Sequence, residues 1–424
     1  MSSSYWIETL GCPKNRVDSE KLEGRLESKG LVPAKNAGNA DLLIINSCAF
    51  IEAARVETIE TVLDLAEAKK RGARLVVTGC MAERYGPELA TELPEVDVVA
   101  GFGRDFLESA SVPVSLTTKP RPSSGVRDFD LLNLARPKSA NSWAYLKIAE
   151  GCNRACGFCA IPSFRGKQQS RSIESIVEEA ASLGVKELVL IAQDLASYGI
   201  DLYGEKRLVS LMERLAGSAD WIRLLYIYPS ELNGKMIDAV LATGVPYFDL
   251  SLQHVSKRLL RRMRRWGSGE KFLELIGRIR GIEPNAVFRS SFIIGYPGET
   301  EADHDELLRF IEEAQLNWGG FFTFSEEEGT FACGLGQKVP KALALERLAE
   351  ASELQDAITY KRRVGLLGTR VKVLADSPGT GRSFREAPEI DGIIKIDSEI
   401  PSGEYRDLVI SGAEGPDLIG ESES

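Results

Sequence analysis

Three cysteines lie within eight residues of one another with the spacing C-x3-C-x2-C: Cys152, Cys156 and Cys159, the loop triad. An apolar, strand-like segment, residues 143–148, precedes them. Cysteine thiolates are the usual protein ligands of iron–sulfur clusters, and a purely structural cluster would take four. Three thiolates leave one iron of a 4Fe–4S cluster without a protein ligand, and a reactive metal site needs such an open position. The spacing therefore predicts a cluster that binds a further molecule.

Other uses of cysteine suit this loop less well. A zinc site would need a second cysteine pair or nearby histidines, and the two histidines, His254 and His304, are far along the chain. A disulfide framework is typical of small secreted chains. The spacing instead resembles the signature of the radical S-adenosylmethionine (radical SAM) enzymes. That resemblance implies that the amino and carboxylate groups of SAM chelate the open iron.

Length and composition describe a globular protein of several domains. At typical domain sizes, 424 residues predict two to three domains. We expect no signal peptide and no membrane helix, since the first residues lack a basic segment and no apolar stretch approaches ~20 residues. A cytoplasmic location follows, where cysteines stay reduced. The net charge of −10 argues against general nucleic-acid binding and is compatible with a basic protein partner.

A second set of three cysteines is spread over the N-terminal unit, residues 1–125. Three apolar segments, residues 5–10, 42–46 and 75–78, are separated by helical patterns near 17–29 and 52–70, which predicts a doubly wound α/β domain. Each segment ends at a cysteine of what we call the N-terminal triad: Cys12, Cys48 and Cys80. Ligand sites of parallel sheets lie at the carboxyl ends of strands. We expect the triad to converge on a second cluster; the alternative is three small buried hydrophobic residues.

The central unit, residues 140–360, alternates six strand candidates with helical patterns, which predicts an open (βα)6 partial barrel. The candidates are residues 144–148, 187–191, 222–228, 247–252, 288–294 and 320–324. Radical SAM barrels bind SAM at the carboxyl ends of such strands. This resemblance makes four residues candidate SAM contacts: Phe158, Gln193, Asp194 and Gln253.

Three other features of the central unit have structural interpretations. Thr300 and Asp303 form the capping pattern of a helix. His254 is expected to be a hydrogen-bonding residue at a strand end, without a catalytic role. Six Lys and Arg residues between positions 257 and 265 indicate a solvated helix face or, alternatively, a docking surface for ribosomal RNA.

Three cysteine motifs give the N-terminal unit a family resemblance. Residues 11–20 read GCPKNRVDSE, residues 46–51 read NSCAFI and residues 78–80 read TGC. These resemble the motifs of the methylthiotransferases, the MiaB/RimO group of radical SAM enzymes, and the resemblance extends over nearly the whole chain. It implies two 4Fe–4S clusters, an auxiliary cluster on the N-terminal triad and a SAM-cleaving cluster on the loop triad.

The resemblance also implies a reaction, in which an unactivated C–H bond is replaced by C–S–CH3. No acid–base side chain removes such a hydrogen, so a radical cofactor must carry the step. In this group one SAM is cleaved to a 5′-deoxyadenosyl radical, the auxiliary cluster supplies or positions the sulfur, and a second SAM supplies the methyl group. An electron donor such as flavodoxin is implied.

The C-terminal unit, residues 362–424, is expected to be a small β-barrel because short strand patterns alternate with Gly and Pro. It resembles the TRAM domain of the same group, which binds the substrate. Residues 363–424 contain seven basic and twelve acidic side chains. Barrels that bind nucleic acid usually carry a basic groove, so this acidic barrel suits a basic protein better.

One segment of the C-terminal unit bears on the substrate. Residues 381–392 read GRSFREAPEIDG, which is similar to the RimO branch of the group. That branch modifies an aspartate β-carbon in a small-subunit ribosomal protein, the twelfth in the standard naming. We hypothesise that Glu386 and Glu389 contact this basic protein. The alternatives are a tRNA adenosine methylthiotransferase of the MiaB type and a non-enzymatic metal-binding scaffold. Residues 110–140, rich in Pro, Ser and Arg, are interpreted as a linker.

Overall fold

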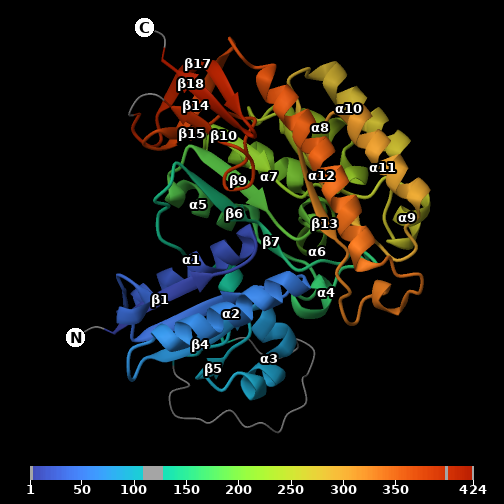
Figure 1. Ribbon diagram of the computed structural model, residues 1–424. Helices are drawn as coiled ribbons and strands as arrows, with labels where there is room; N and C mark the ends of the chain where they lie inside the picture. Colours follow the sequence, from blue (N-terminus) through green and yellow to red (C-terminus); the bar gives the residue numbers. More distant parts are fainter. Residues whose placement is uncertain (1–2, 108–127, 397–399, 423–424) are drawn as a thin grey trace.

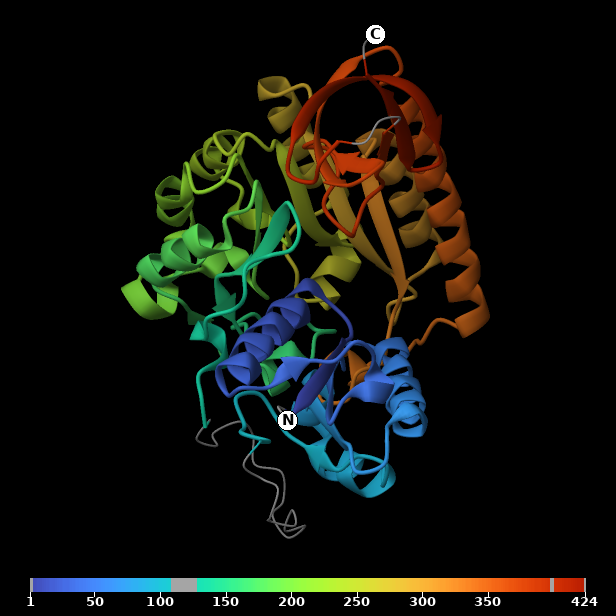
Figure 2. The same ribbon diagram turned by 90° about the vertical axis from the view of Figure 1, so that its left-hand side faces the viewer.

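The computed structural model describes residues 3–107, 128–396 and 400–422. An α/β sheet domain, a partial barrel and a small closed β-barrel follow one another along the chain (Figures 1 and 2), as the sequence predicts. Much of the proposed linker lies outside the described residues. Within the described ranges, no helix is long and apolar enough to cross a membrane.

The N-terminal domain is a five-stranded parallel sheet with the strand order β2-β1-β3-β4-β5. The three predicted strands and two predicted helices are all present, and β3 is buried along its whole length because helices flank a central strand. The edge strands β2 and β5 have two residues each, too few to give a sequence pattern. The elements are β1 (Ser4–Thr9), α1 (Pro13–Ser28), β2 (Val32–Pro33), β3 (Leu42–Ser47), α2 (Glu52–Ala68), β4 (Arg74–Gly79), α3 (Cys80–Glu92) and β5 (Val98–Val99).

The central domain is an open partial barrel of six parallel strands. It consists of two three-stranded sheets, β6-β9-β10 and β11-β12-β13, which are joined by a bridge between Ile227 and Leu250. Strand β10 ends four residues before its predicted end, because Tyr226 has a φ of 64° and its N–H donates to the Asp249 carboxylate. The strands are β6 (Trp143–Lys147), β9 (Glu187–Ile191), β10 (Trp221–Leu224), β11 (Tyr247–Gln253), β12 (Val287–Ile294) and β13 (Trp318–Thr323).

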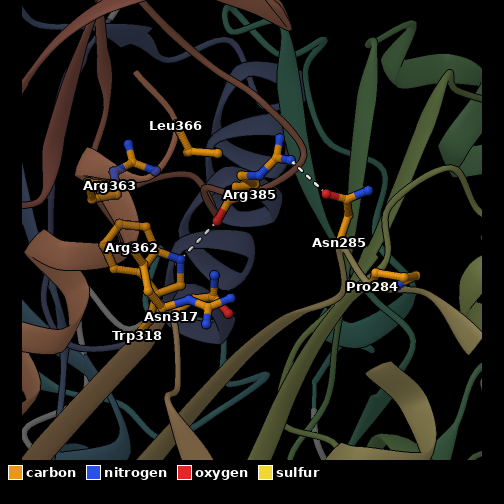
Figure 3. Close-up of a pocket in the computed structure, with 8 residues that line it drawn as sticks. All are labelled: Pro284, Asn285, Asn317, Trp318, Arg362, Arg363, Leu366 and Arg385. Atoms are coloured by element: carbon orange, nitrogen blue, oxygen red, sulfur yellow. Dashed lines mark hydrogen bonds between the residues drawn. The ribbon is translucent and has the colours of Figure 1, made fainter. Parts of the chain in front are cut away.

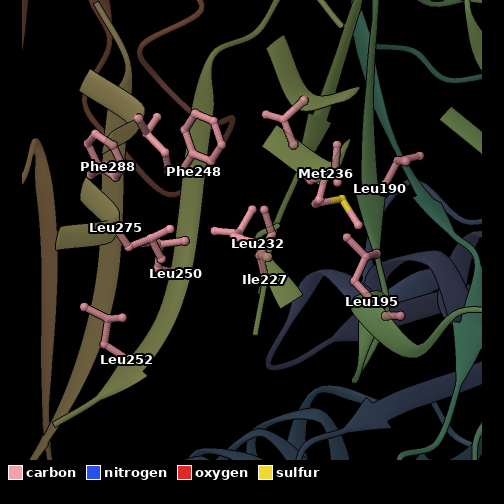
Figure 4. Packing of buried hydrophobic residues seen from close by; sticks show 14 of the residues in the cluster. Leu190, Leu195, Ile227, Leu232, Met236, Phe248, Leu250, Leu252, Leu275 and Phe288 are labelled. Atoms are coloured by element: carbon pink, nitrogen blue, oxygen red, sulfur yellow. The ribbon is translucent and has the colours of Figure 1, made fainter. Parts of the chain in front are cut away.

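Helices cover the outer face of these strands, and the core lies between the two layers (Figure 4). Side chains alternate along each strand, so Leu190 and Leu250 pack under the helices while Val189 and Tyr247 face the inside of the barrel. The principal helices are α5 (Ile173–Leu183), α7 (Leu208–Leu215), α8 (Gly234–Leu241), α10 (Gly269–Ile282), α11 (Glu301–Ala314) and α12 (Lys341–Val364). Shorter elements are β7 (Ala149–Glu150), α4 (Ile161–Phe164), β8 (Gln169–Ser170), α6 (Ile200–Tyr203) and α9 (Lys257–Arg262).

The C-terminal domain is a closed barrel with the strand order β14-β15-β16-β18-β17, as predicted. Its interior is filled by small and branched apolar side chains such as Val373, Ile394 and Leu408, all of them buried. The strands are β14 (Arg370–Ser377), β15 (Thr380–Arg382), β16 (Ile394–Ile396), β17 (Tyr405–Glu414) and β18 (Asp417–Glu421).

Residues 383–391, which follow β15, leave the small barrel and enter the inside of the partial barrel, where Ala387 packs in one cluster with Tyr145 and Tyr247; we call this segment the plug loop. Figure 2 shows this part of the chain, in orange, reaching down from the C-terminal barrel. Two barrel side chains donate to its carbonyl groups: Trp318 Nε1 to Arg385 O at 2.8 Å and Tyr145 OH to Pro388 O at 3.1 Å. The loop thus closes the amino end of the partial barrel.

The hypothesis that Glu386 contacts a protein substrate is wrong. Glu386 is fully buried, pairs with Arg363, and accepts hydrogen bonds from the Ser383 backbone at 2.8 Å and the Ser383 hydroxyl at 2.6 Å. Glu389 is about half exposed and pairs with Arg16 of α1. Glu386 therefore stabilises the fold by neutralising buried Arg363, because an unpaired buried charge costs several kcal/mol.

Candidate functional site

The N-terminal triad lies at the carboxyl edge of the N-terminal sheet. Cys12 immediately precedes α1, Cys48 follows β3 directly, and Cys80 begins α3 after β4. The chain turns tightly at Gly11, whose φ is 89°, and a Cβ there would lie 2.7 Å from Cys48 Sγ. Glycine at this position lets the Cys12 turn approach Cys48. The structure therefore brings together three cysteines that are distant in sequence.

Positive charge surrounds this triad. Arg165 is buried, and its Nη2 atom lies 3.0 Å from Cys80 Sγ. Burial raises the pKa of the Cys12 thiol, but the charges of Lys14 and Arg165 and the backbone N–H groups of Asn15 and Lys14 outweigh it and lower the pKa. Burial raises the pKa of Cys48 to about 12. Thiolates are the form that binds iron, so the cations suit a cluster that replaces the thiol protons.

The thiols are not arranged around a single ion. Across the described ranges, no three His, Cys, Asp or Glu side chains are close enough to share one metal ion. Each thiolate of a cluster binds a different iron, so the spacing required for a 4Fe–4S cluster is wider.

The loop triad follows β6 and β7, and backbone contacts fix its loop in place. Gly157 N–H donates to Met263 O at 2.8 Å, and Gly157 O accepts from Ala332 N at 2.8 Å. A Cβ on Gly157 would lie 3.2 Å from the Phe331 ring. At the start of the loop, Gly151 has a φ of 77°, and a Cβ there would overlap Lys167 O at 2.3 Å. Segments far along the chain thus determine the shape of the cysteine loop.

Arg154, Tyr228 and Arg265 adjoin the loop triad, and sequence reasoning missed all three. Arg265 Nη1 lies 3.5 Å from Cys156 Sγ, and the Arg154 backbone N–H lies 3.4 Å from Cys152 Sγ. The Tyr228 ring contacts both guanidinium groups, at 3.7 Å for Arg154 and 4.0 Å for Arg265. The position of Arg154 inside the cysteine loop was the one local signal; Arg265 belongs to the basic segment that we read as a surface.

The candidate SAM contacts lie at the carboxyl ends of β9 and β11 and in the cysteine loop. Asp194 is buried and accepts from Arg154 Nε at 2.6 Å. Gln193 donates to Glu150, and its Oε1 atom is buried without a partner among the described residues. Gln253 is half-buried with a φ of 71°, and Phe158 packs against the barrel core. A contact with SAM stays a proposal for each.

Two further predictions concern the segment after β11. His254 is buried, its Nδ1 accepts from Ser256 N at 3.0 Å, and burial lowers its pKa to about 4, so it is a neutral acceptor. In the basic segment, Arg258 donates to Gly298 O at 2.7 Å and Arg264 lies 4.0 Å from the Phe331 ring. Contacts within the protein thus occupy part of the proposed docking surface.

The two triads lie close to the same short helix, α4. It begins two residues after Cys159, and Phe164 packs in the same buried cluster as Cys48 and Cys80. Figure 1 shows α4 beside the N-terminal domain. Arg165, directly after α4, contacts Cys80 on one side and donates a hydrogen bond to the Glu150 carboxylate on the other, at 2.9 Å. The short segment from α4 to Arg165 therefore lies beside both triads.

Three family models match successive parts of the chain. The model described as "Uncharacterized protein family UPF0004" matches residues 4–101, the radical SAM superfamily matches residues 146–311, and the TRAM domain matches residues 367–422.

Curated relatives match nearly the whole chain. A protein of Aquifex aeolicus named ribosomal protein uS12 methylthiotransferase RimO is 42% identical over 430 residues, which cover 98% of this chain and 96% of the relative. A protein of the same name from Moorella thermoacetica is 43% identical over 403 residues, or 92% of each chain. This chain belongs to the RimO family of radical SAM methylthiotransferases. RimO proteins are enzymes that transfer a sulfur-containing group, and their cofactors are SAM and 4Fe–4S clusters.

Membership of the RimO family confirms the resemblance found in the sequence and disfavours the MiaB-type and scaffold alternatives. Among solved structures, the chain resembles OxsB, a cobalamin-dependent S-adenosylmethionine radical enzyme, with a TM-score of 0.53 at 11% identity. The match covers 84% of this chain and 56% of the OxsB chain. At that identity it shows a shared fold alone.

Proposed function

We propose that this RimO-family enzyme adds a methylthio group to the β-carbon of an aspartate in ribosomal protein uS12. The name of the relatives gives the substrate. The net charge of −10 supports it, because an acidic enzyme attracts a basic ribosomal protein. The observation that carries the proposal is the position of both cysteine triads beside α4, since hydrogen removal and sulfur insertion must occur at one carbon.

The two triads would hold two clusters, the loop triad the one that binds SAM and the N-terminal triad the auxiliary one. When bound, these cofactors supply the radical chemistry that breaks an unactivated C–H bond. The chain itself supplies charge and position. Arg165 and Lys14 balance thiolate charge in the N-terminal domain, and Arg265 does so at Cys156.

The four candidate residues, at the carboxyl ends of β9 and β11 and in the cysteine loop, would bind SAM. Gln193 has a buried Oε1 acceptor without a partner among the described residues, which suits an N–H or O–H donor of a ligand. Asp194 is already held by Arg154, so its role would be to fix that guanidinium beside the cysteine loop. Phe158 would pack against SAM, and Gln253 would form a hydrogen bond with it.

The remaining partners follow from this chemistry. The reaction needs an electron donor, and we propose a flavodoxin-type protein in the cytoplasm. Lys257 and Arg261 are exposed on α9, and their side chains form no hydrogen bond or ion pair with the described residues. They are the part of the basic segment that remains available for ribosomal RNA.

The test uses the anaerobically reconstituted enzyme with SAM, a reductant, and either uS12 or tRNA, followed by mass spectrometry. We expect the methylthio mass increment on uS12 and about eight irons per chain, since two 4Fe–4S clusters contain that number. Replacing the loop triad by Ala should abolish 5′-deoxyadenosine formation. Replacing the N-terminal triad by Ala should preserve it and stop methylthiolation. Modification of tRNA without uS12 would overturn the substrate proposal.

A further inference from the structure

An unassigned cluster of basic side chains lies at the other end of the partial barrel from the cysteines. It lines a cavity of about 100 Å³ where the amino ends of β12 and β13 meet the end of α12 and the plug loop. Figure 3 shows how the polar lining side chains converge from these segments. They are Arg362 and Arg363 of α12, Arg385 of the plug loop, and Asn285, Asn317 and Trp318 of the partial barrel.

The three arginines have little compensating negative charge. Arg363 pairs with Glu386, but its Nε and Nη2 atoms are buried without partners. The Arg362 side chain forms no hydrogen bond or ion pair with any residue that the structure describes, and its Nε atom is also buried. The Arg385 side chain donates to the Asn285 side-chain oxygen, at 3.5 Å, and to no other residue that the structure describes, and it lies over the Phe384 ring. Several guanidinium N–H groups are thus left without acceptors.

The surrounding charges increase this imbalance. Burial lowers the pKa of Arg362, and burial together with Arg363 and Arg362 lowers that of Arg385. Arg280 of α10 is close enough that burial and the charge of Arg362 lower its pKa to about 10. Arg280 does not line the cavity and donates to Ala314 O and Gln315 O, both at 2.8 Å. The carboxylates that act on the lining arginines are Glu283 and Glu386. Desolvated cations without counter-charges are costly, and a bound anion would remove that cost.

Helix end effects explain only part of the cluster. Arg362 and Arg363 lie in the last turn of α12, where the helix dipole favours cations. That effect does not account for Arg385, which arrives from the plug loop. Nor does it account for the two asparagines. Asn317 accepts from Phe288 N at 3.0 Å and Asn285 accepts from Arg385, which leaves both amide NH2 groups as further donors.

We propose that this cavity binds a phosphate group. Guanidinium groups pair with phosphate oxygens through two parallel hydrogen bonds, and donors arriving from three segments suit an anion with several oxygens. A volume of about 100 Å³ is several times the about 10–15 Å³ that a single water needs when cavities are measured with a water-sized probe, so the cavity has room for a phosphate group. The bound group would link α12, the partial barrel and the plug loop. This inference does not rest on the proposed function.

The test is isothermal titration calorimetry of the reconstituted full-length chain with inorganic phosphate, at constant ionic strength set with chloride. Arg362→Gln removes a guanidinium that forms no hydrogen bond or ion pair with the described residues, so the variant should keep its fold. Lys361→Gln is the matched control, since it removes the same charge from the exposed side of the same turn. We expect binding to be at least about tenfold weaker in Arg362→Gln and unchanged in Lys361→Gln, as for loss of a charged hydrogen bond.

A second arm identifies the source of the phosphate group. A short single-stranded RNA that binds, competes with inorganic phosphate and loses affinity in Arg362→Gln would show that the site takes a backbone phosphate. Binding of inorganic phosphate without RNA would show a site for the free anion. Equal phosphate affinity in wild type and Arg362→Gln, or no binding of either probe to wild type, would overturn the proposal. Unchanged SAM cleavage by the variant verifies that it is folded.

Discussion

Arg165 joins the two halves of the proposed site through charge. Its guanidinium lies 3.0 Å from Asp18, 2.9 Å from Glu150 and 3.0 Å from Cys80 Sγ, and all four side chains are buried. Replacing Arg165 by Met leaves two buried carboxylates with Lys147 as their remaining cation. Removing one partner of a buried ion pair costs about 3–5 kcal/mol.

We therefore expect Arg165→Met to lower the urea midpoint of the cluster-free chain substantially. Exposed Arg261 provides the comparison, because Arg261→Met should change the free energy of unfolding by less than about 0.5 kcal/mol. Similar midpoints for the two variants would contradict the structural role of Arg165.

His254 should make stability depend on pH. Burial lowers its pKa to about 4, from an ordinary value near 6.5. Because the folded-state pKa is the lower one, the stabilisation is complete above about pH 6.5 and is lost as pH falls through about 4. A shift of this size corresponds to about 3 kcal/mol.

The variant His254→Asn lacks this titration, so its deficit in unfolding free energy relative to wild type should shrink as pH falls from about 7 to about 4. Urea unfolding of both proteins across that range is the measurement. A difference that stays constant with pH would show that His254 does not titrate between these limits.

At the residue scale, the sequence predicted those site residues whose pattern lies within a short segment. The spacing of the loop triad and the strand-end positions of the N-terminal triad are visible without a structure. The contact between Arg265 and Cys156 spans 109 positions, and no local pattern encodes it. The roles of Tyr228 and Arg165 were hidden for the same reason, since both act on segments far away in the chain.

At the level of single elements, α11 carries a capping box that the sequence predicted and the structure confirms. The Thr300 side chain accepts from Asp303 N at 3.4 Å, and the Asp303 carboxylate accepts from Thr300 N at 2.9 Å. Loss of such a cap costs about 1 kcal/mol. We expect Thr300→Ala to lower the thermal midpoint, while Thr300→Ser, which keeps the hydroxyl, leaves it nearly unchanged. Equal midpoints in a thermal melt would contradict the role of the cap.

Elements whose limits depend on distant residues were harder to predict. The apolar run after residue 222 suggested a longer β10, but the Asp249 carboxylate binds Tyr226 N in a left-handed conformation and ends the strand. The sequence of residues 381–392 was recognised as similar to the RimO branch, but its path through the structure was not predicted. Its course into the partial barrel depends on Tyr145, Tyr247 and Trp318, which belong to another domain.

At the scale of the whole molecule, Glu187 connects two domains. It is fully buried between Arg223 of the partial barrel, at 2.7 Å, and Arg382 of the C-terminal barrel, at 2.6 Å. The neutral variant Glu187→Gln leaves two buried guanidinium groups undercompensated, which should cost about 3 kcal/mol or more.

We expect Glu187→Gln to loosen the C-terminal barrel and to increase cleavage near the end of α12 in limited proteolysis. Glu178→Gln is the control, because Glu178 is exposed on the neighbouring helix α5. Identical cleavage patterns in the two variants would show that the connection does not depend on this ion pair.

The plug loop also determines when the partial barrel can finish folding during synthesis of the chain. The strands that it covers begin at residue 143, whereas the loop itself, residues 383–391, is made more than two hundred residues later. Domains fold as they leave the ribosome, those nearest the N-terminus first. A nascent chain released before residue 383 would hold all six triad cysteines and yet expose Trp143, Tyr145 and Tyr247 on an open inner face. Chaperones and proteases act on such incompletely folded chains. Iron that is bound before translation ends would therefore be bound to a chain that can still be degraded.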